Sequence, residues 1–135
     1  MANLILDTGV LIAIERGVLT LDELRDPTST VAVAAITVAE FTVGTLRAAI
    51  EQQADLRRRF LATVLREARV LTYDQTTAAV HAQLLAAATA QGLPWGAHDL
   101  IIAAHAAQTG RILVTTDDRA DFGSLPGLSV RTVHR

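Results

Sequence analysis

The sequence predicts an α/β fold in which a central, mainly parallel sheet of four to five strands lies between two layers of helices. Short apolar runs of strand length alternate along the chain with longer segments whose apolar residues recur at helical spacing. The connections between these segments are short, and strands that alternate with helices in this way usually pair in parallel. At 135 residues the chain is long enough for a real core, and we expect one domain over residues 1–135.

Five apolar segments are expected to form the sheet. The first, 4–6, ends in an acidic residue and is followed at once by a helical pattern. The second, 31–36, is apolar on both faces, as a buried parallel strand should be. The remaining strands are expected at 70–73, 111–115 and 129–133.

The helices are expected between these strands, and glycines mark several of their ends. Gly17, Gly92 and Gly110 each follow an apolar-periodic segment, which is where helices commonly stop. The expected helices are 8–15, a short one within 19–24, 37–49, 51–68, 75–90 and 98–108. In the segment 37–49, the expected core positions are Val38, Phe41 and Leu46. In the segment 51–68, they are Leu56, Phe60, Leu61, Val64 and Leu65.

Composition excludes several classes of protein. The chain has no Cys, which excludes disulfides, thiolate zinc sites and thiol nucleophiles. It has no Lys either, so a P-loop or a Schiff-base mechanism is excluded. No apolar run has the roughly 18 residues of a membrane span, and no basic segment precedes the first strand as in a signal peptide. We therefore expect a cytoplasmic protein, and the Arg-rich, Lys-free composition suggests a bacterial one.

Four acidic residues are expected to meet at one edge of the sheet. Asp7, Glu40 and Asp117 each follow the end of a strand, and Asp99 begins a helix whose far end leads into the fourth strand. If the first strand is central, with the second and fourth beside it, these carboxylates converge at the carboxyl ends of the strands. Asp74 also follows a strand, but the third strand should lie further out, and we interpret Asp74 as a helix cap.

Each of the four acids also has a purely structural interpretation. Asp7 and Asp99 could cap helices, and Asp117 could be an ordinary turn residue. Glu40 lies three residues after Thr37, which is the spacing of a capping box. Taken one at a time these interpretations are favoured, whereas the position of all four at one edge favours a site.

Four carboxylates in one place repel, so either some hold protons or a cation neutralises them. Oxygen ligands without Cys or paired His favour Mg²⁺ or Mn²⁺. Such an ion on an open acidic cluster typically contacts phosphate oxygens and activates water. The residues alone thus indicate metal-dependent phosphodiester or phosphoryl chemistry and leave the substrate open.

Four stretches of sequence surround these acids. They are Leu6-Asp7-Thr8-Gly9-Val10-Leu11-Ile12, Ile36-Thr37-Val38-Ala39-Glu40-Phe41-Thr42-Val43-Gly44, His98-Asp99-Leu100-Ile101-Ile102-Ala103-Ala104-His105 and Leu113-Val114-Thr115-Thr116-Asp117. In order and spacing they resemble PIN-domain ribonucleases, most of all the VapC toxins of type II toxin–antitoxin pairs. The resemblance covers nearly the whole chain, including Asp121-Phe122 and Leu125-Pro126-Gly127 near its end.

This resemblance implies a PIN-like three-layer α/β/α sandwich and an endoribonuclease that uses Mg²⁺ or Mn²⁺. In that mechanism Asp7 and Asp99 hold the principal metal, and Asp117 and Glu40 complete the site directly or through water. A metal-bound water would attack the phosphorus in line. Asp118 could replace Asp117, because the stretch 117–121 holds more acids than the family pattern requires. Thr8 and Thr115 would be supporting hydroxyls.

The resemblance also implies partners. Members of the family are commonly homodimers, and a small VapB-like antitoxin lays its C-terminal segment along an apolar groove of the toxin, which otherwise cuts RNA and inhibits growth. Arg16, after the first helix, and His98, beside Asp99, are candidates for contacting RNA. The run Arg57-Arg58-Arg59 is more typical of the solvated face of its helix.

Two other functions stay open at this point. One is a catalytically silent PIN-fold module that acts only by binding antitoxin or RNA. The other is a metal-dependent DNA nuclease or phosphatase on a similar sheet. A haloacid-type phosphatase needs a second Asp two residues after its nucleophile, and Gly9 occupies that position.

Overall fold

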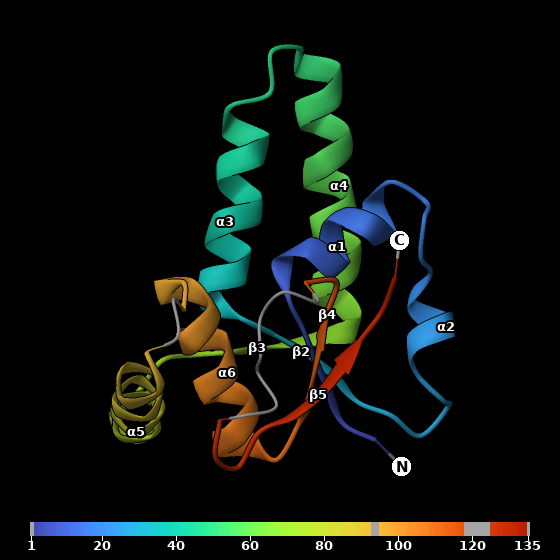
Figure 1. The fold of residues 1–135 in the computed structure, drawn as a ribbon. Helices are drawn as coiled ribbons and strands as arrows, with labels where there is room; N and C mark the ends of the chain where they lie inside the picture. Colours follow the sequence, from blue (N-terminus) through green and yellow to red (C-terminus); the bar gives the residue numbers. More distant parts are fainter. Residues whose placement is uncertain (1, 93–94, 118–124, 135) are drawn as a thin grey trace.

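The computed structural model describes residues 2–92, 95–117 and 125–134, and it confirms the predicted α/β fold. Five strands form one sheet in the order β3-β2-β1-β4-β5, and every neighbouring pair is parallel (Figure 1). The strand bounds are β1 (Leu4–Leu6), β2 (Val31–Ala34), β3 (Ala68–Leu71), β4 (Ile112–Thr115) and β5 (Ser129–Thr132). The first strand is central, as the convergence of the acids requires.

Helices cover both faces of this sheet, because successive strand residues point to opposite sides. Ile5 belongs to the core cluster beneath α5 (Gln75–Gln91) and α6 (Ala97–Thr109). Leu4 and Leu6 belong to the cluster on the other face. That face carries α1 (Thr8–Glu15), α2 (Leu21–Leu24), α3 (Ala35–Leu46) and α4 (Glu51–Glu67). In the part of the chain described here, no helix is both long enough and apolar enough to span a membrane.

Four strands have bounds that differ from the prediction: β4 begins at Ile112 instead of residue 111, β5 ends at Thr132 instead of residue 133, and β2 and β3 differ by two residues. β2 ends at Ala34 and α3 begins at Ala35, although strand character was expected to continue to residue 36. The apolar run continues across this junction and therefore does not reveal where the strand ends. β3 occupies Ala68–Leu71 instead of 70–73, because its register pairs Ala68 with Val31 and Leu71 with Ala34.

Helices α3 and α4 form a hairpin that extends well beyond the sheet (Figure 1). Two residues expected in the core lie on its outer turns: Leu46 is 77% exposed and Leu56 is 59% exposed. The prediction was wrong for both because an amphipathic pattern identifies an apolar face without identifying what covers it. Nearer the sheet, Phe41 is buried and packs against Phe60 at 5.5 Å between ring centroids.

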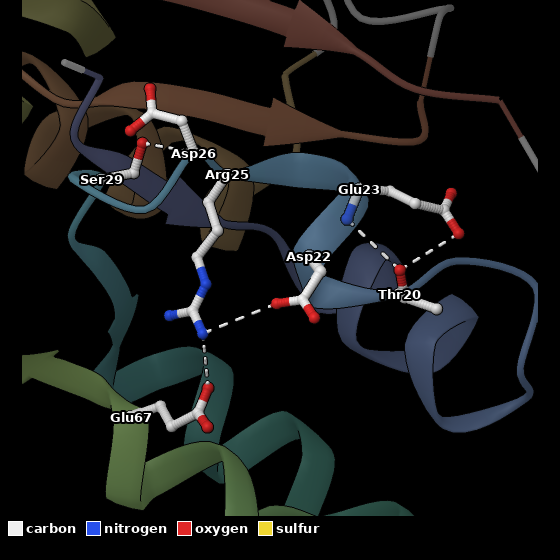
Figure 2. A network of polar contacts seen from close by, with 7 residues as sticks. All are labelled: Thr20, Asp22, Glu23, Arg25, Asp26, Ser29 and Glu67. Atoms are coloured by element: carbon white, nitrogen blue, oxygen red, sulfur yellow. Dashed lines mark hydrogen bonds and ion pairs between the residues drawn. The ribbon is translucent and has the colours of Figure 1, made fainter.

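The connection from α1 to β2 is attached to the end of α4 by a network of polar contacts (Figure 2). Thr20 caps the short helix α2 by accepting a hydrogen bond from the backbone N–H of Glu23 at 3.2 Å. Directly after α2, Arg25 forms an ion pair with Glu67 at 3.0 Å. These contacts hold the segment that precedes β2, which pairs with β1.

Candidate acidic site

Asp7 lies at the carboxyl end of the central strand and is held from two sides. Its Oδ1 accepts a hydrogen bond from the backbone N–H of Thr8 at 2.7 Å. Its Oδ2 accepts one from the hydroxyl of Thr115, at the end of the neighbouring strand β4, at 2.9 Å. Asp7 is also the N-cap of α1, so the structural interpretation is correct as well. The contact with Thr115 is more than a cap requires, because it joins two strands.

Glu40 reaches the same place from α3. Its Oε1 accepts a hydrogen bond from the Thr8 hydroxyl at 3.1 Å, and its Oε2 lies 3.3 Å from Nδ1 of His98 on α6. The alternative interpretation of Glu40 as part of a capping box is wrong. Ala34 is the N-cap of α3, without a side-chain cap bond, and Thr37 lies buried inside the helix. Glu40 therefore bridges α1 and α6.

Asp99 lies in the first turn of α6, where Gly96 is the N-cap and no side-chain cap bond forms. The cap interpretation of Asp99 is therefore also wrong. Burial raises the pKa of Asp99, and the charges of Asp7, Asp117 and Glu40 raise it further, against an opposing effect of His98. Gly96 leaves space for this carboxylate, because a Cβ at position 96 would lie 2.8 Å from Oδ2 of Asp99.

Asp117 follows β4, and its backbone N–H donates to Oγ1 of Thr115 at 3.0 Å. Thr115 is fully buried, and its single hydroxyl thus connects the Asp117 backbone to the carboxylate of Asp7. The competing candidate Asp118 lies outside the described residues, as do Asp121 and Phe122. The choice between Asp117 and Asp118 as the fourth acid therefore stays a prediction.

The charges of Glu40 and Asp117 act on both Asp7 and Asp99. Burial raises the pKa of Asp7, the hydrogen bonds from Thr115 and Thr8 lower it, and the charges of Glu40 and Asp117 raise it again. A carboxyl group with a raised pKa lies where its charged form is disfavoured, and a nearby cation would reverse that. The structure thus places the acids that the sequence singled out at the carboxyl edge of the sheet, near enough for charges to act on Asp7 and Asp99.

The donor atoms at this edge are carboxylate and hydroxyl oxygens, which suit a hard divalent ion such as Mg²⁺ or Mn²⁺. Within the described residues, however, no group of three or more His, Asp or Glu side chains is arranged so that it could hold a metal ion. The chemistry of the donors fits such an ion, and coordination by three acids would require their side chains to move together.

The structure separates the two predicted RNA-contacting residues. His98 lies at the site, against Glu40. Arg16 is the C-cap of α1, at the opposite end from the N-cap Asp7, and about 13 Å from it along the helix axis.

Sequence reasoning missed the packing roles of Gly96 and Gly9. A Cβ at Gly9 would lie 2.6 Å from Oγ1 of Thr116, so this glycine lets α1 approach the end of β4. Its position just after a strand-end acid was the available signal.

Comparisons with known proteins show a family and a fold that this chain shares. The sequence matches the family model of the PIN domain over residues 4–126. A structure of VapBC-5 from Mycobacterium tuberculosis, a member of the VapBC family of toxin–antitoxin systems, has a chain that is 32% identical. That match covers 98% of this chain and 100% of the other, with a TM-score of 0.79. No curated protein matches the chain.

Two further structures share the fold. A chain of VapBC2 from Rickettsia felis, solved with a DNA fragment from its promoter, is 21% identical and has a TM-score of 0.84, with 97% of this chain and 98% of that chain covered. A chain of DNA-bound VapBC from Salmonella typhimurium is 25% identical with a TM-score of 0.74, and 98% of each chain is covered.

Proposed function

Because this chain belongs to the PIN-domain family and is of the VapC type, we propose that it is a Mg²⁺- or Mn²⁺-dependent endoribonuclease and the toxin of a type II toxin–antitoxin pair. The observation that supports the proposal is that Glu40, from a separate element, lies near enough to Asp7 and Asp99 at the end of the central strand to raise the pKa of both. Cleavage of cellular RNA by such a site would inhibit translation and growth.

The side chains divide the work of this site. Asp7 and Asp99 would hold the principal metal, and Glu40 and Asp117 (or Asp118) would complete it directly or through water. When bound, Mg²⁺ or Mn²⁺ supplies positive charge for phosphate oxygens and lowers the pKa of a coordinated water.

Three neighbours act by positioning these acids. Thr115 orients the Asp7 carboxylate, because its hydroxyl bonds Oδ2. Thr8 and His98 hold Glu40 by its two oxygens, so that this carboxylate faces the space between α1 and α6. Such outer contacts fix the direction in which a carboxylate presents its lone pairs.

The α3–α4 hairpin supports the proposed antitoxin partner. Val43, Leu46, Ile50 and Leu56 are exposed large apolar residues of this hairpin and the turn within it. A cleft of about 430 Å³ lies beside them and is lined by residues of α3, α4 and the end of α1, including Glu15, Gly44 and Arg57. An apolar segment of a VapB-like antitoxin would cover these residues from water, which favours binding by about 25 cal/mol per Å² of apolar surface buried. The functional unit would be a homodimer of the toxin.

The direct test is to express the protein without antitoxin, map RNA ends, and assay purified protein on RNA and DNA with Mg²⁺ or Mn²⁺. Asp99→Asn should reduce RNA cleavage by more than about 100-fold, as expected for loss of a principal ligand. Asp22→Asn is the matched control, because its side chain is 93% exposed on α2. Equal cleavage by wild type and Asp99→Asn would exclude the mechanism.

The same assay separates the alternatives. A protein that cuts neither nucleic acid with either metal would be the catalytically silent module, which is favoured by the absence, among the described residues, of three acids placed to hold a metal ion. Cleavage of DNA but not RNA would instead indicate a DNA nuclease.

A further inference from the structure

A second pocket, of about 330 Å³, lies at the other end of α6 from the acids. Asp99 is in the first turn of α6, whereas Gln108 and Thr109 from its last turn line this pocket. Ten residues of α-helix separate the two places by about 15 Å along the axis. A group bound in this pocket is therefore distinct from one bound at the acids.

Two arginines from distant parts of the chain line this pocket. Arg69 is the second residue of β3 and pairs in register with Ala32 of β2. Leu71, two residues further along β3, belongs to the core beneath α5 and α6, so Arg69 points to the same side of the sheet. Arg111 precedes β4, and its Nη1 donates to the carbonyl oxygen of Leu4 and to Oγ1 of Thr30, both at 3.1 Å.

The charge of Arg69 acts on Arg111, and neither arginine forms an ion pair with an acid among the described residues. Burial lowers the pKa of Arg111, and the charge of Arg69 lowers it further. Within the described part of the chain, Arg69 forms no hydrogen bond or ion pair. Asp74 is the one acid among the described residues that line the pocket, and its Oδ1 is held by the N–H and hydroxyl of Thr77. The pocket thus combines two cations with one carboxylate, whose Oδ1 is already bonded to Thr77.

A nearly buried imidazole completes the pocket. His105 is 1% exposed and lines the pocket, and burial lowers its pKa against an opposing effect of Asp74. Its ring packs edge-on against Tyr73 at 6.2 Å between centroids, and among the described residues it forms no side-chain hydrogen bond. An imidazole carries at least one N–H donor in either protonation state, so His105 adds a donor of a second kind to the two guanidinium groups.

We propose that this pocket binds a phosphate group, either a backbone phosphate of RNA or the phosphate of a free nucleotide. Guanidinium groups match phosphate oxygens with two parallel hydrogen bonds, and the pocket volume lies at the lower end of the range for small-molecule sites. The RNA form of this inference rests on the proposed function and adds a contact remote from the cut bond. The nucleotide form does not depend on it.

The test compares Arg69→Gln with Arg66→Gln. Arg66 is exposed on α4 and, among the described residues, forms no hydrogen bond or ion pair, so its variant makes the same change of charge away from the pocket. Binding of inorganic phosphate, AMP and a short single-stranded RNA is measured by calorimetry in EDTA, where no metal-dependent cleavage occurs. Thermal melting of each variant verifies the fold, and Arg69→Lys tests whether charge alone suffices.

Arg69→Gln should weaken binding of the cognate probe roughly tenfold or more, because a charge-assisted contact is lost, while Arg66→Gln matches wild type. If RNA is the source, the slope of log affinity against log salt should also fall by about 0.7 in Arg69→Gln. Weaker AMP binding with unchanged RNA binding would assign the pocket to a free nucleotide. Equal binding of all three probes by Arg69→Gln and Arg66→Gln would overturn the proposal. Asp99→Asn should keep this binding. Failure of the phosphate-pocket proposal is therefore distinguishable from failure of the proposed nuclease function.

Discussion

Asp7 and Asp74 both follow the carboxyl end of a parallel strand, and both are N-caps, yet their pKa values shift in opposite directions. Asp74 follows β3 at the edge of the sheet, where it forms a capping box with Thr77 at the start of α5. Hydrogen bonds from the backbone and side chain of Thr77 lower the pKa of Asp74. Asp7 follows β1 at the centre, and burial raises its pKa.

The difference shows that position across the sheet decides what a strand-end aspartate does. β1 is flanked by β2 and β4, and the segments after these strands bring Glu40 and Asp117 towards Asp7. β3 has only β2 as a neighbour, so Asp74 keeps its exposed position and interacts with its own helix. The same sequence pattern therefore gives a structural cap at the edge and part of a charged cluster at the centre.

The largest expected effect separates the two residues by activity. Asp7→Asn should lower RNA cleavage by more than about 100-fold, since it removes a ligand charge from the proposed metal site. At saturating RNA, where binding in the second pocket does not limit the rate, Asp74→Asn should cleave at the wild-type rate, because Asn is also a good N-cap and α5 remains intact. Single-turnover cleavage with Mn²⁺, well below the melting temperature of each variant, measures both. Comparable losses in the two variants would end the distinction between centre and edge.

The next effect is stabilisation by the metal itself, which needs no substrate. An ion present at a hundred times its Kd should stabilise the wild-type fold by about 2.7 kcal/mol and raise its Tm. Asp7→Asn should lose this increase, and Asp74→Asn should keep it. Differential scanning calorimetry with and without Mn²⁺ gives the answer. An equal increase in Tm for Asp7→Asn would place the bound ion somewhere other than the central acids.

A smaller effect is expected from the hydroxyl that holds Asp7. Thr115→Val removes the hydrogen bond to Oδ2, so the pKa of Asp7 should rise further, and cleavage should fall about tenfold, as is common for outer contacts of metal ligands. Thr115→Ser should restore both, and NMR titration of the Asp7 carboxyl measures the shift. Thr63→Val is the control, because that exposed hydroxyl bonds the backbone of its own helix at Arg59. A drop in activity without a change in the titration would indicate a packing defect.

Much of this molecule follows from local sequence signals. The bounds of β1 and α1 were predicted to the residue, because an apolar run ends at Asp7 and a glycine follows the helix at position 17. Asp74 and Gly92 likewise delimit α5. In each case a residue with a strong backbone preference stands at the junction.

What could not be predicted depends on contacts between distant segments. The exposure of Leu46 and Leu56 depends on how far the α3–α4 hairpin extends past the sheet, which helical periodicity does not determine. The acids could be placed at one edge by topology alone, but the contact of Glu40 with His98 depends on side-chain reach. No sequence motif indicates that Arg69 and Arg111 line the same pocket, because only the fold brings these residues near each other.

The smallest effect is the opposite response of the two regions to pH in metal-free protein. The raised pKa of Asp99, caused first by burial, means that its charged form disfavours the fold. Asp99→Asn should therefore melt higher than wild type at pH 7, by roughly 2–5 °C for screened charges in a domain of this size. That advantage should shrink as the pH falls through the raised pKa towards the ordinary value of 3.8.

Asp74→Asn should instead melt roughly 1–4 °C lower at pH 7, because the lowered pKa of Asp74 reflects favourable bonds of its charged form. This deficit should persist at pH 5 and shrink only as the pH falls below 3.8. Melting temperatures measured in EDTA from pH 3 to pH 8 test both signs, and a deficit in both variants at pH 7 would mean that the central acids stabilise the fold without a cation.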